Sequence, residues 1–316
     1  MRIVFFGSPE FAVPSLRALL GEGFDVAGVV TQPDKSQGRS RSALIPPPVK
    51  QVAAAEDLAV LQPERPVGAE FLDALKALDP ELGVVVAYGH ILKPALLAIP
   101  RLGMINVHAS LLPKLRGAAP IQHALIEGLV ETGVSIMQIE EGLDTGPVLL
   151  RVATPVAPDE TAGELTTRLA EMGALALVEA LEMMESGVVE PEAQDHAGAT
   201  YAPKITRELA HIPWDAPAEQ VARLVRALDA KPGAWTTLEG REVKLFGPTE
   251  RQGNGGAPAP GPAPAPGTVL ATDPALLVMT GSGALEFADV QPSGATRMPA
   301  GAWIRGRGVR AGQRFG

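Results

Sequence analysis

Short apolar runs alternate with amphipathic stretches over the first 190 residues of the chain. Apolar runs of this length are typical of buried β-strands, and stretches with apolar residues at helical spacing predict helices between them. The predicted strands are 3–6, 26–30, 83–87, 104–107, 134–139 and 148–156, and the predicted helices are 9–20, one from 49, 71–78, 119–127 and 162–186. This order predicts an α/β fold with a mostly parallel sheet and helices on both faces.

Two helix starts carry capping signals. Ser8 precedes Pro9 at the end of the first predicted strand, so we expect Ser8 to cap the helix and Pro9 to occupy its first turn. Asp215 stands just before a predicted helix at 217–230 and is the expected cap there.

The pattern changes after Tyr201. Short β-like pieces separated by turn residues predict a small barrel, with strands at 234–238, 242–246, 268–271, 275–280 and 284–290. Residues 253–267 are almost entirely Gly, Pro and Ala, which predicts a flexible loop or semi-rigid spacer. We therefore expect two domains, 1–203 and 204–316.

Composition narrows the class of protein. The 316 residues are 46% hydrophobic and 20% charged, as in globular domains, and they include no cysteine. The absence of cysteine excludes disulfides, thiolate metal sites and a cysteine nucleophile. No apolar run reaches the length of a signal-peptide core or a membrane span. We expect a cytoplasmic protein without a membrane contact.

The charge is unevenly distributed along the chain. The net charge is −9, but residues 204–316 hold 13 Lys and Arg against 10 Asp and Glu. Five arginines and no acidic residue follow position 296: Arg297, Arg305, Arg307, Arg310 and Arg314. This asymmetry is typical of a polyanion-binding second half, and a solvated basic tail is the alternative interpretation.

Candidate chemistry lies in and after two of the predicted strands. Asn106 and His108 fall at period two in an apolar run, so a strand would put both on one face. Polar groups on so apolar a strand are costly unless they are partnered or functional. Asp144 stands between Gly142 and Gly146 after the strand at 134–139, and we expect it to converge with Asn106 and His108.

An amide, an imidazole and a carboxylate suit acyl transfer. Asn106 can donate to an oxygen that gains negative charge, His108 can donate to it or move a proton, and Asp144 can hold the imidazole. Taken singly, a strand histidine is more often a core residue, and an isolated Asp-Thr-Gly is more often a turn. The chain has no G-x-S-x-G, so direct attack by a substrate amine is simpler than an acyl-enzyme.

Two other site classes are not supported by the sequence. Gly7-Ser8-Pro9 does not match the G-x-G-x-x-G of nicotinamide-binding enzymes. The five histidines form no metal-ligand spacing with nearby acids, so we expect no metal.

The motifs at 106–113, 116–117 and 142–146 together resemble the folate-dependent formyltransferases. Residues 31–35, 46–50, 86–89 and 117–122 are most similar to the members that formylate methionyl initiator tRNA, and the likeness weakens after Tyr201. The resemblance implies a Rossmann-like first domain, an OB-like tRNA-binding second domain, and 10-formyltetrahydrofolate as the formyl donor.

The resemblance also implies roles for particular residues. It makes Asn106, His108 and Asp144 catalytic. Its folate contacts correspond to Ser110, Leu111, Leu112, Pro113, Val86, Tyr88, Gly89 and Glu141. Its tRNA contacts correspond to the loop at 34–45, and with the basic C-terminal residues these give Lys35, Arg39, Arg41, Arg305, Arg307 and Arg310. Residues 40–43 depart from the lysine-rich loop common in the family, which implies fewer phosphate contacts.

Three hypotheses follow. The first is formyl transfer to the methionyl α-amino group, by a monomer that supplies formylated initiator tRNA for translation. The second keeps the chemistry and changes the acceptor to a sugar-nucleotide or other small amine, or to water in a formyl-folate hydrolase. The third is a catalytically inactive folate- or RNA-binding protein, against which the complete set of Asn106, His108 and Asp144 argues.

Overall fold

The computed structural model describes residues 1–37, 43–251 and 264–316. The described chain forms two compact units. Unit 1 comprises residues 1–120, 131–155 and 166–203, and unit 2 comprises residues 121–130, 156–165 and 204–316. Two short segments that precede residue 203 thus belong to the second unit, and a functional division at residue 203 stays a prediction.

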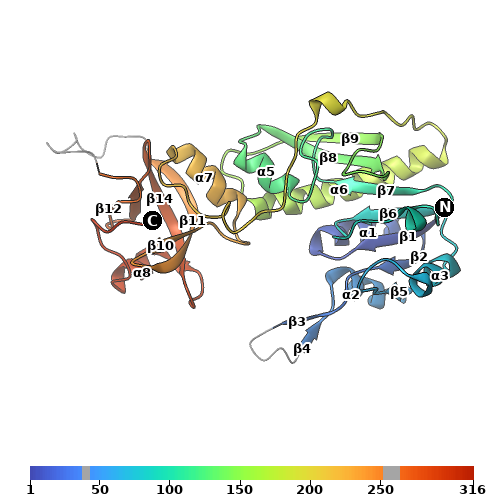
Figure 1. Cartoon of the computed structure of the whole chain (residues 1–316), viewed down its shortest axis with the longest axis horizontal. Helices are drawn as coiled ribbons and strands as arrows, with labels where there is room; N and C mark the ends of the chain where they lie inside the picture. The colour runs from blue at the N-terminus through green and yellow to red at the C-terminus, as the bar shows by residue number, and fades with distance from the viewer. Residues whose placement is uncertain (38–42, 252–263) are drawn as a thin grey trace. The chain divides into compact units, whose positions relative to one another are not determined.

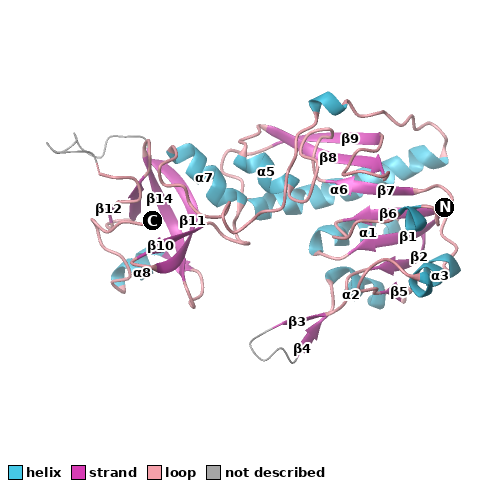
Figure 2. Ribbon diagram, viewed as in Figure 1, coloured by secondary structure: helices cyan, strands magenta, loops and turns pink. Residues whose placement is uncertain are grey.

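Unit 1 is built on a seven-stranded sheet with the order β5-β2-β1-β6-β7-β8-β9 (Figures 1 and 2). Its strands are β1 (Arg2–Gly7), β2 (Asp25–Val30), β5 (Val60–Leu61), β6 (Leu82–Val86), β7 (Met104–His108), β8 (Glu131–Gln138) and β9 (Val148–Pro155). The first five strands of the chain in this sheet are parallel, as expected from the alternation with helices. β8 is antiparallel to β7, and β9 is antiparallel to β8.

Helices cover both faces of this sheet, as predicted. The helical elements assigned wholly to unit 1 are η1 (Glu10–Ala12), α1 (Val13–Gly21), α2 (Pro48–Ala55), α3 (Ala69–Ala77), α4 (Pro94–Leu97) and η2 (His196–Gly198). On one face, Met104 of β7 shares a core cluster with Leu75 of α3 and Leu96 of α4. On the other face, α6 (Ala162–Glu185) approaches β7 so closely that a Cβ on Gly173 would lie 2.9 Å from Val107 Cγ1. A short hairpin of β3 (Lys35–Gln37) and β4 (Ala43–Ile45) extends from the sheet (Figure 1).

Neither predicted helix cap is formed. Pro9, not Ser8, is the N-cap residue of η1, and no side chain caps it. Ser8 Oγ instead accepts hydrogen bonds from Thr31 Oγ1 at 3.1 Å and from the backbone N of Gln32 at 3.0 Å, which joins the ends of β1 and β2. The helix predicted at 217–230 begins after the N-cap residue Pro217, again without a side-chain cap from Asp215.

Unit 2 contains an antiparallel sheet with the order β10-β11-β14-β13-β12, and β15 pairs with β14. Its strands are β10 (Trp235–Leu238), β11 (Arg241–Arg251), β12 (Val269–Ala271), β13 (Leu276–Met279), β14 (Ala284–Pro292) and β15 (Met298–Pro299). All five predicted strands are present. The unit also holds α7 (Ala218–Ala227), α8 (Ala300–Arg305) and α5 (Pro120–Ile126) apart from its first residue.

The core of unit 2 is built around aromatic rings. Trp214 stacks on Phe315 with centroids 5.7 Å apart, contacts Phe287 edge-on and donates from Nε1 to Thr236 Oγ1. The spacer predicted at 253–267 falls mostly outside the described residues. No helix in the described ranges is long and apolar enough to cross a membrane.

Candidate active site

β7 carries two of the three predicted catalytic side chains. Asn106 pairs with Val85 of β6 on one side and with Met137 of β8 on the other, and His108 ends the strand opposite Ser135. The pleat puts both on the Met104 face. Asn106 is half-buried, and its side-chain amide has no hydrogen-bond partner among the residues that the structure describes. The amide is therefore available to a ligand.

Hydrogen bonding at one nitrogen of His108 fixes the role of the other. The ring is buried, and its Nε2 lies 3.1 Å from the carbonyl oxygen of Leu115. A carbonyl can only accept, so Nε2 carries a proton and donates it. In the neutral imidazole, Nδ1 is then the nitrogen with the lone pair. Nδ1 is also the nitrogen that faces the third predicted catalytic residue.

Asp144 reaches this histidine from a loop. Its Oδ2 lies 3.8 Å from His108 Nδ1 and accepts a hydrogen bond from the backbone N of Gly117 at 2.8 Å. The 3.8 Å separation is too long for a hydrogen bond and short enough for an ion pair when the imidazole is protonated. The structure thus brings Asp144 and His108 together, and Asn106 lies two residues earlier on the same face of β7.

The loop that carries Asp144 follows an antiparallel strand. Because β8 runs antiparallel, its last residue, Gln138, pairs with Ile105, near the start of β7. The loop must therefore run back along β7 by three residues, about 10 Å, to reach His108. A parallel sheet would have delivered the loop to the end of β7 directly. The antiparallel direction of β8 thus changes the path of the loop, but the side chains of Asp144 and His108 still lie close together.

The predicted folate-contact segment 110–113 follows β7 and is held by Ser135 of β8. Ser135 Oγ donates to the carbonyl oxygen of Ser110 at 2.7 Å and accepts from the backbone N of Leu112 at 3.1 Å. Ser110 Oγ is itself bonded to the carbonyl oxygen of Lys114. The segment is therefore fixed chiefly through its backbone, and contact of Ser110, Leu111, Leu112 and Pro113 with folate stays a prediction.

The other predicted folate residues lie beside Asn106 or in the same loop as Asp144. Val86 directly follows Val85, the pairing partner of Asn106, and Ala87 and Gly89 both have positive φ values. Glu141 is exposed in the Asp144 loop. The structure does not single out a side-chain role for any of these residues, so their folate contacts stay predictions.

Tyr88 departs from the picture of a pocket-lining side chain. The residue is 1% exposed, and its ring belongs to a core cluster with Phe6, Val85 and Leu96. Its hydroxyl has no partner in the described part of the chain, and burial raises the pKa of Tyr88 to about 12. The polar contact that Tyr88 makes comes from its backbone, whose carbonyl oxygen accepts a hydrogen bond from Gln32 Nε2 at 3.1 Å.

A polar cluster anchors the base of the β3–β4 hairpin. Lys50 Nζ lies 2.9 and 2.8 Å from the two carboxylate oxygens of Asp34, and Gln62 Nε2 donates to Asp34 Oδ1 at 2.8 Å. These hydrogen bonds, from Gln62 first and then Lys50, lower the pKa of Asp34. Lys35, a predicted tRNA contact, is exposed and donates to Gln32 Oε1. Arg39 and Arg41 lie outside the described residues.

The C-terminal arginines fall into two groups. Arg297 lies 2.7 Å from Asp229 and 2.9 Å from Asp289, so carboxylates neutralise it. Arg305, Arg307 and Arg310 are exposed, and no carboxylate among the described residues lies within ion-pair distance of them. These three arginines are available for an external anion, and their contact with tRNA stays a prediction.

Several residues of the site were not expected from the sequence. Ser8 and Gln32 tie the ends of β1 and β2 to the Tyr88 loop, and Gln194 contacts the Asp144 loop. The sequence indicated Ser8 only as a helix cap and Gln32 only as part of the segment 31–35, and it places Gln194 in a polar stretch with no motif. Arg116 was recognised only as part of the Arg-Gly pair, and no signal indicated its burial.

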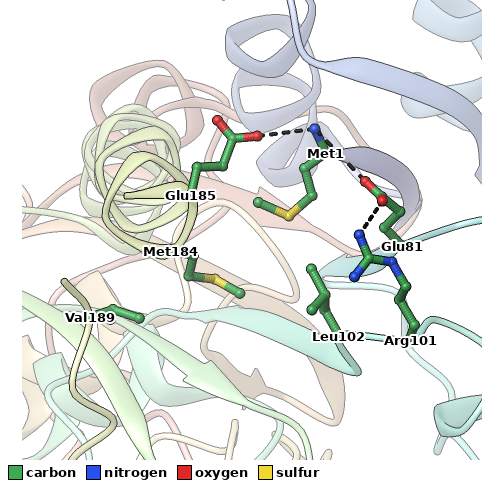
Figure 3. A pocket seen from close by; sticks show the side chains of 7 residues that line it. All are labelled: Met1, Glu81, Arg101, Leu102, Met184, Glu185 and Val189. Atoms are coloured by element: carbon green, nitrogen blue, oxygen red, sulfur yellow. Dashed lines mark hydrogen bonds and ion pairs between the residues drawn. The ribbon is translucent and has the colours of Figure 1, made fainter. Parts of the chain in front are cut away.

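A separate pocket lies at the amino-terminal ends of β1 and β6, and Figure 3 shows the side chains that line it. It is lined by Met1, Glu81, Arg101, Leu102, Met184, Glu185 and Val189. Met1 and Glu81 directly precede β1 and β6, whereas ligands of parallel sheets bind beyond the carboxyl ends of the strands. The amino group of Met1 lies 3.0 Å from Glu185, and Glu81 pairs with Arg101. The charged groups that line this pocket are thus paired with one another.

Within the described ranges, no group of three or more His, Asp or Glu residues is arranged to hold a metal ion.

Comparison with known protein families assigns both parts of the chain. The family model described as formyl transferase matches residues 1–181, and the formyl transferase C-terminal domain matches residues 204–308. The match includes Asn106, His108 and Asp144.

Curated relatives match over nearly the whole length. A methionyl-tRNA formyltransferase of Halorhodospira halophila is 46% identical over 313 residues, which cover 99% of this chain and 98% of the relative. One from Aromatoleum aromaticum is 45% identical over 316 residues, covering 100% and 97%.

Solved structures agree in fold. A methionyl-tRNA formyltransferase from Clostridium thermocellum superposes with a TM-score of 0.59 at 15% identity, over 80% of this chain and 95% of that one. HypX from Aquifex aeolicus, in complex with tetrahydrofolic acid, gives a TM-score of 0.62 at 21% identity, over 97% and 47%.

Proposed function

The chain belongs to the methionyl-tRNA formyltransferase family, and from this we propose that it transfers the formyl group of 10-formyltetrahydrofolate to the α-amino group of methionyl initiator tRNA. The product, N-formylmethionyl-tRNA, serves translation initiation. The observation that carries the proposal is the His108–Asp144 pair beside the unpartnered amide of Asn106. We place this reaction in the cytoplasm.

His108 acts through Nδ1. Since Leu115 keeps the proton on Nε2, the lone pair of Nδ1 can take a proton from the attacking amine. The imidazolium so formed faces Asp144 Oδ2 at 3.8 Å, where the carboxylate stabilises its charge. Protonated Nδ1 can then return the proton to the leaving nitrogen.

Asn106 supplies the oxyanion donor. Its amide can donate to the formyl oxygen as negative charge develops there, because no group among the described residues accepts a hydrogen bond from it. Gly117 holds Asp144 through a backbone bond, so the carboxylate keeps its place while the charge on His108 changes.

The residues present fit a folate co-substrate. The unpartnered Asn106 amide and the half-buried carboxylate of Asp144 offer polar contacts next to the segments 86–89 and 110–113. Bound there, 10-formyltetrahydrofolate supplies the formyl carbon. We propose that Val86, Tyr88, Gly89 and Glu141 contact the pterin, with Tyr88 contributing its backbone. We propose that the backbone of Ser110, Leu111, Leu112 and Pro113 also contacts the folate.

The tRNA substrate is bound by basic groups in both units. We propose that the antiparallel sheet of unit 2 is an OB-like barrel, a common nucleic-acid platform, and that Arg305, Arg307 and Arg310 contact phosphates. Lys35, Arg39 and Arg41 of the loop 34–45 add further contacts. We propose that residues 204–316 act as the tRNA-binding domain, that 1–203 act as the catalytic domain, and that the protein works as a monomer.

Other acceptors are not favoured. A sugar 3N-formyltransferase structure superposes on 94% of this chain at only 16% identity, which is a likeness of fold alone. The full-length curated relatives at 45–46% identity are methionyl-tRNA formyltransferases.

A labelling experiment tests the proposal. The protein is mixed with 10-formyltetrahydrofolate carrying a labelled formyl group and with charged initiator tRNA, uncharged tRNA, or a panel of amino sugars. We expect label only on the methionyl tRNA. Label on a small amine, or release of labelled formate with no tRNA product, would refute the proposed acceptor.

A further inference from the structure

The loop that carries Asp144 is held in a conformation that it would not keep unaided. Asp144 has a φ of +52°, in the left-handed region, and Gly142 has a φ of +132°. A non-glycine residue in that region is strained and persists only when its surroundings hold it. The surroundings of the loop therefore decide where the Asp144 carboxylate points.

Gln194 provides the contacts to the loop backbone. Its Nε2 donates to the carbonyl oxygen of Asp144 at 3.0 Å and to that of Gly146 at 2.6 Å. The residue is 6% exposed, so no bulk water replaces these bonds. An amide nitrogen has two N–H groups, and both are used on the two sides of the left-handed turn.

Arg116 fixes the orientation of that amide. Its Nε and Nη2 lie 3.1 and 2.7 Å from Gln194 Oε1, and the residue is 2% exposed. A guanidinium can only donate, so Oε1 must face Arg116 and Nε2 must face the loop. If the Gln194 amide were flipped, its N–H groups would face the N–H groups of Arg116, and its oxygen would face the carbonyl oxygens of Asp144 and Gly146. Arg116 Nη2 also lies 3.1 Å from Nδ1 of His196, which accepts its hydrogen bond.

The same stretch of chain holds both ends of Asp144. Gly117, which follows Arg116, donates its backbone N–H to the carboxylate, while Arg116 acts on the Asp144 backbone through Gln194. The main chain of Arg116 is itself bonded to Thr200 and Ala202. The carboxylate and the backbone of Asp144 are thus both held by contacts that start from the same short segment, Arg116 and Gly117.

We propose that Gln194 is a positioning residue for Asp144, with Arg116 orienting its amide. The inference rests on the proposed catalytic role of Asp144. Without the two bonds from Nε2, the turn relaxes from its left-handed conformation, and Oδ2 moves away from His108 Nδ1. Gln194 touches no reacting atom and acts only through the geometry of the loop.

Gln194→Glu is the sharpest test. The carboxylate keeps the size of the side chain and the contact with Arg116, but it presents an oxygen instead of N–H groups to the two carbonyls. We expect kcat to fall roughly 10- to 100-fold, the usual effect of a misplacement of about 1 Å. We expect KM for tRNA and for the formyl donor to change less than threefold.

The second variant and the control separate positioning from general damage. Gln194→Asn keeps a neutral amide that is too short to span Arg116 and the loop, and we expect a smaller loss of kcat in the same direction. Asp195→Asn is the matched control, because the exposed Asp195 carboxylate accepts, among the residues that the structure describes, only from the backbone N of Ala197 in the neighbouring turn. We expect the control to keep kcat within twofold.

Amide hydrogen exchange provides a readout that needs no substrate. The Gly117 N–H is bonded to Asp144 Oδ2, and we expect its exchange to become about tenfold faster or more in both Gln194 variants. Unchanged Gly117 exchange together with kcat within threefold of wild type would overturn the inference. If the unmodified protein formylates no tRNA, the proposed function fails, and the exchange rates still decide whether Gln194 holds the loop.

Discussion

Removal of the Asn106 side chain tests the reaction mechanism most directly. Asn106 lies in the middle of β7, between Val85 of β6 and Met137 of β8, so the backbone of the sheet fixes its position. Its amide is half-buried and bonds to no group in the described part of the chain. Asn106→Ala therefore removes a donor without leaving a protein group unpaired.

The expected effect follows from that setting. Loss of one preorganised oxyanion donor costs about 2.7–4 kcal/mol of transition-state stabilisation, which lowers kcat by about 10²- to 10³-fold. Since no hydrogen bond within the described ranges is lost, we expect the free energy of unfolding to change by less than about 1 kcal/mol. The variant should thus lose most of its activity while its stability stays close to that of the wild type.

Steady-state kinetics with charged initiator tRNA, together with urea unfolding, provides the assay. Gln138→Ala is the matched control, because Gln138 is a half-buried polar residue on neighbouring β8, opposite Ile105. We expect near wild-type kcat for the control. A loss under threefold for Asn106→Ala, or a loss that merely follows a large drop in stability, would refute the oxyanion role.

Four further predictions concern other parts of the molecule. Tyr88→Phe removes an unpartnered buried hydroxyl and should raise the free energy of unfolding by about 1 kcal/mol at pH 7. Because burial raises the pKa of Tyr88 to about 12, the unfolded chain loses the phenol proton at a lower pH than the folded protein does, so the free energy of unfolding is unaffected below pH 10 and falls by about 2–3 kcal/mol as the pH rises through 12; this fall should be absent in the variant, and equal alkaline denaturation of both proteins would contradict it. Gly117→Ala places a Cβ 2.7 Å from the carbonyl oxygen of Ala202 at a φ of +123°, so we expect kcat to fall at least tenfold, and kinetics at wild-type level would exclude a need for this backbone donor. The lowered pKa of Asp34 means that its contribution to stability is present above about pH 4 and is lost as the pH falls through its lower folded pKa, so Asp34→Asn should flatten acid unfolding curves, and an unaltered curve would count against the cluster. Arg39→Ala should weaken tRNA binding and reduce the slope of log Kd against log salt by about one, and an unchanged slope would remove Arg39 from the phosphate contacts.

The sequence predicted the elements well because their signals are local. The strand–helix alternation of unit 1 and all five predicted strands of unit 2 are present. The cap predicted at Ser8 was wrong because Ser8 bonds to Thr31 and Gln32, which are distant in sequence, and the cap predicted at Asp215 was wrong because α7 begins two residues later, after Pro217. The antiparallel direction of β8 and β9 was missed because apolar runs carry no information about strand direction.

The site was only partly predictable. Asn106, His108 and Asp144 stand in recognisable motifs, and the structure brings His108 and Asp144 within 3.8 Å. Tyr88 stands in the segment 86–89, which also resembles the family. Its ring is packed in the core, and nothing in the neighbouring sequence indicated this burial. Gln194 lies 50 residues from Asp144 in a polar stretch, and only coordinates reveal their hydrogen bond.

The sequence alone determined which residues could form strands and helices, which side chains share a face of β7, and which family the motifs resemble. These properties depend on periodicity and on residue chemistry, which are written in consecutive positions. The tertiary structure decided that Leu115 fixes the proton of His108, that the Asp144 loop runs back along an antiparallel strand, and that Arg116 and Gln194 hold it there. Such contacts join segments far apart in the chain, because packing and hydrogen bonding select partners by position in space.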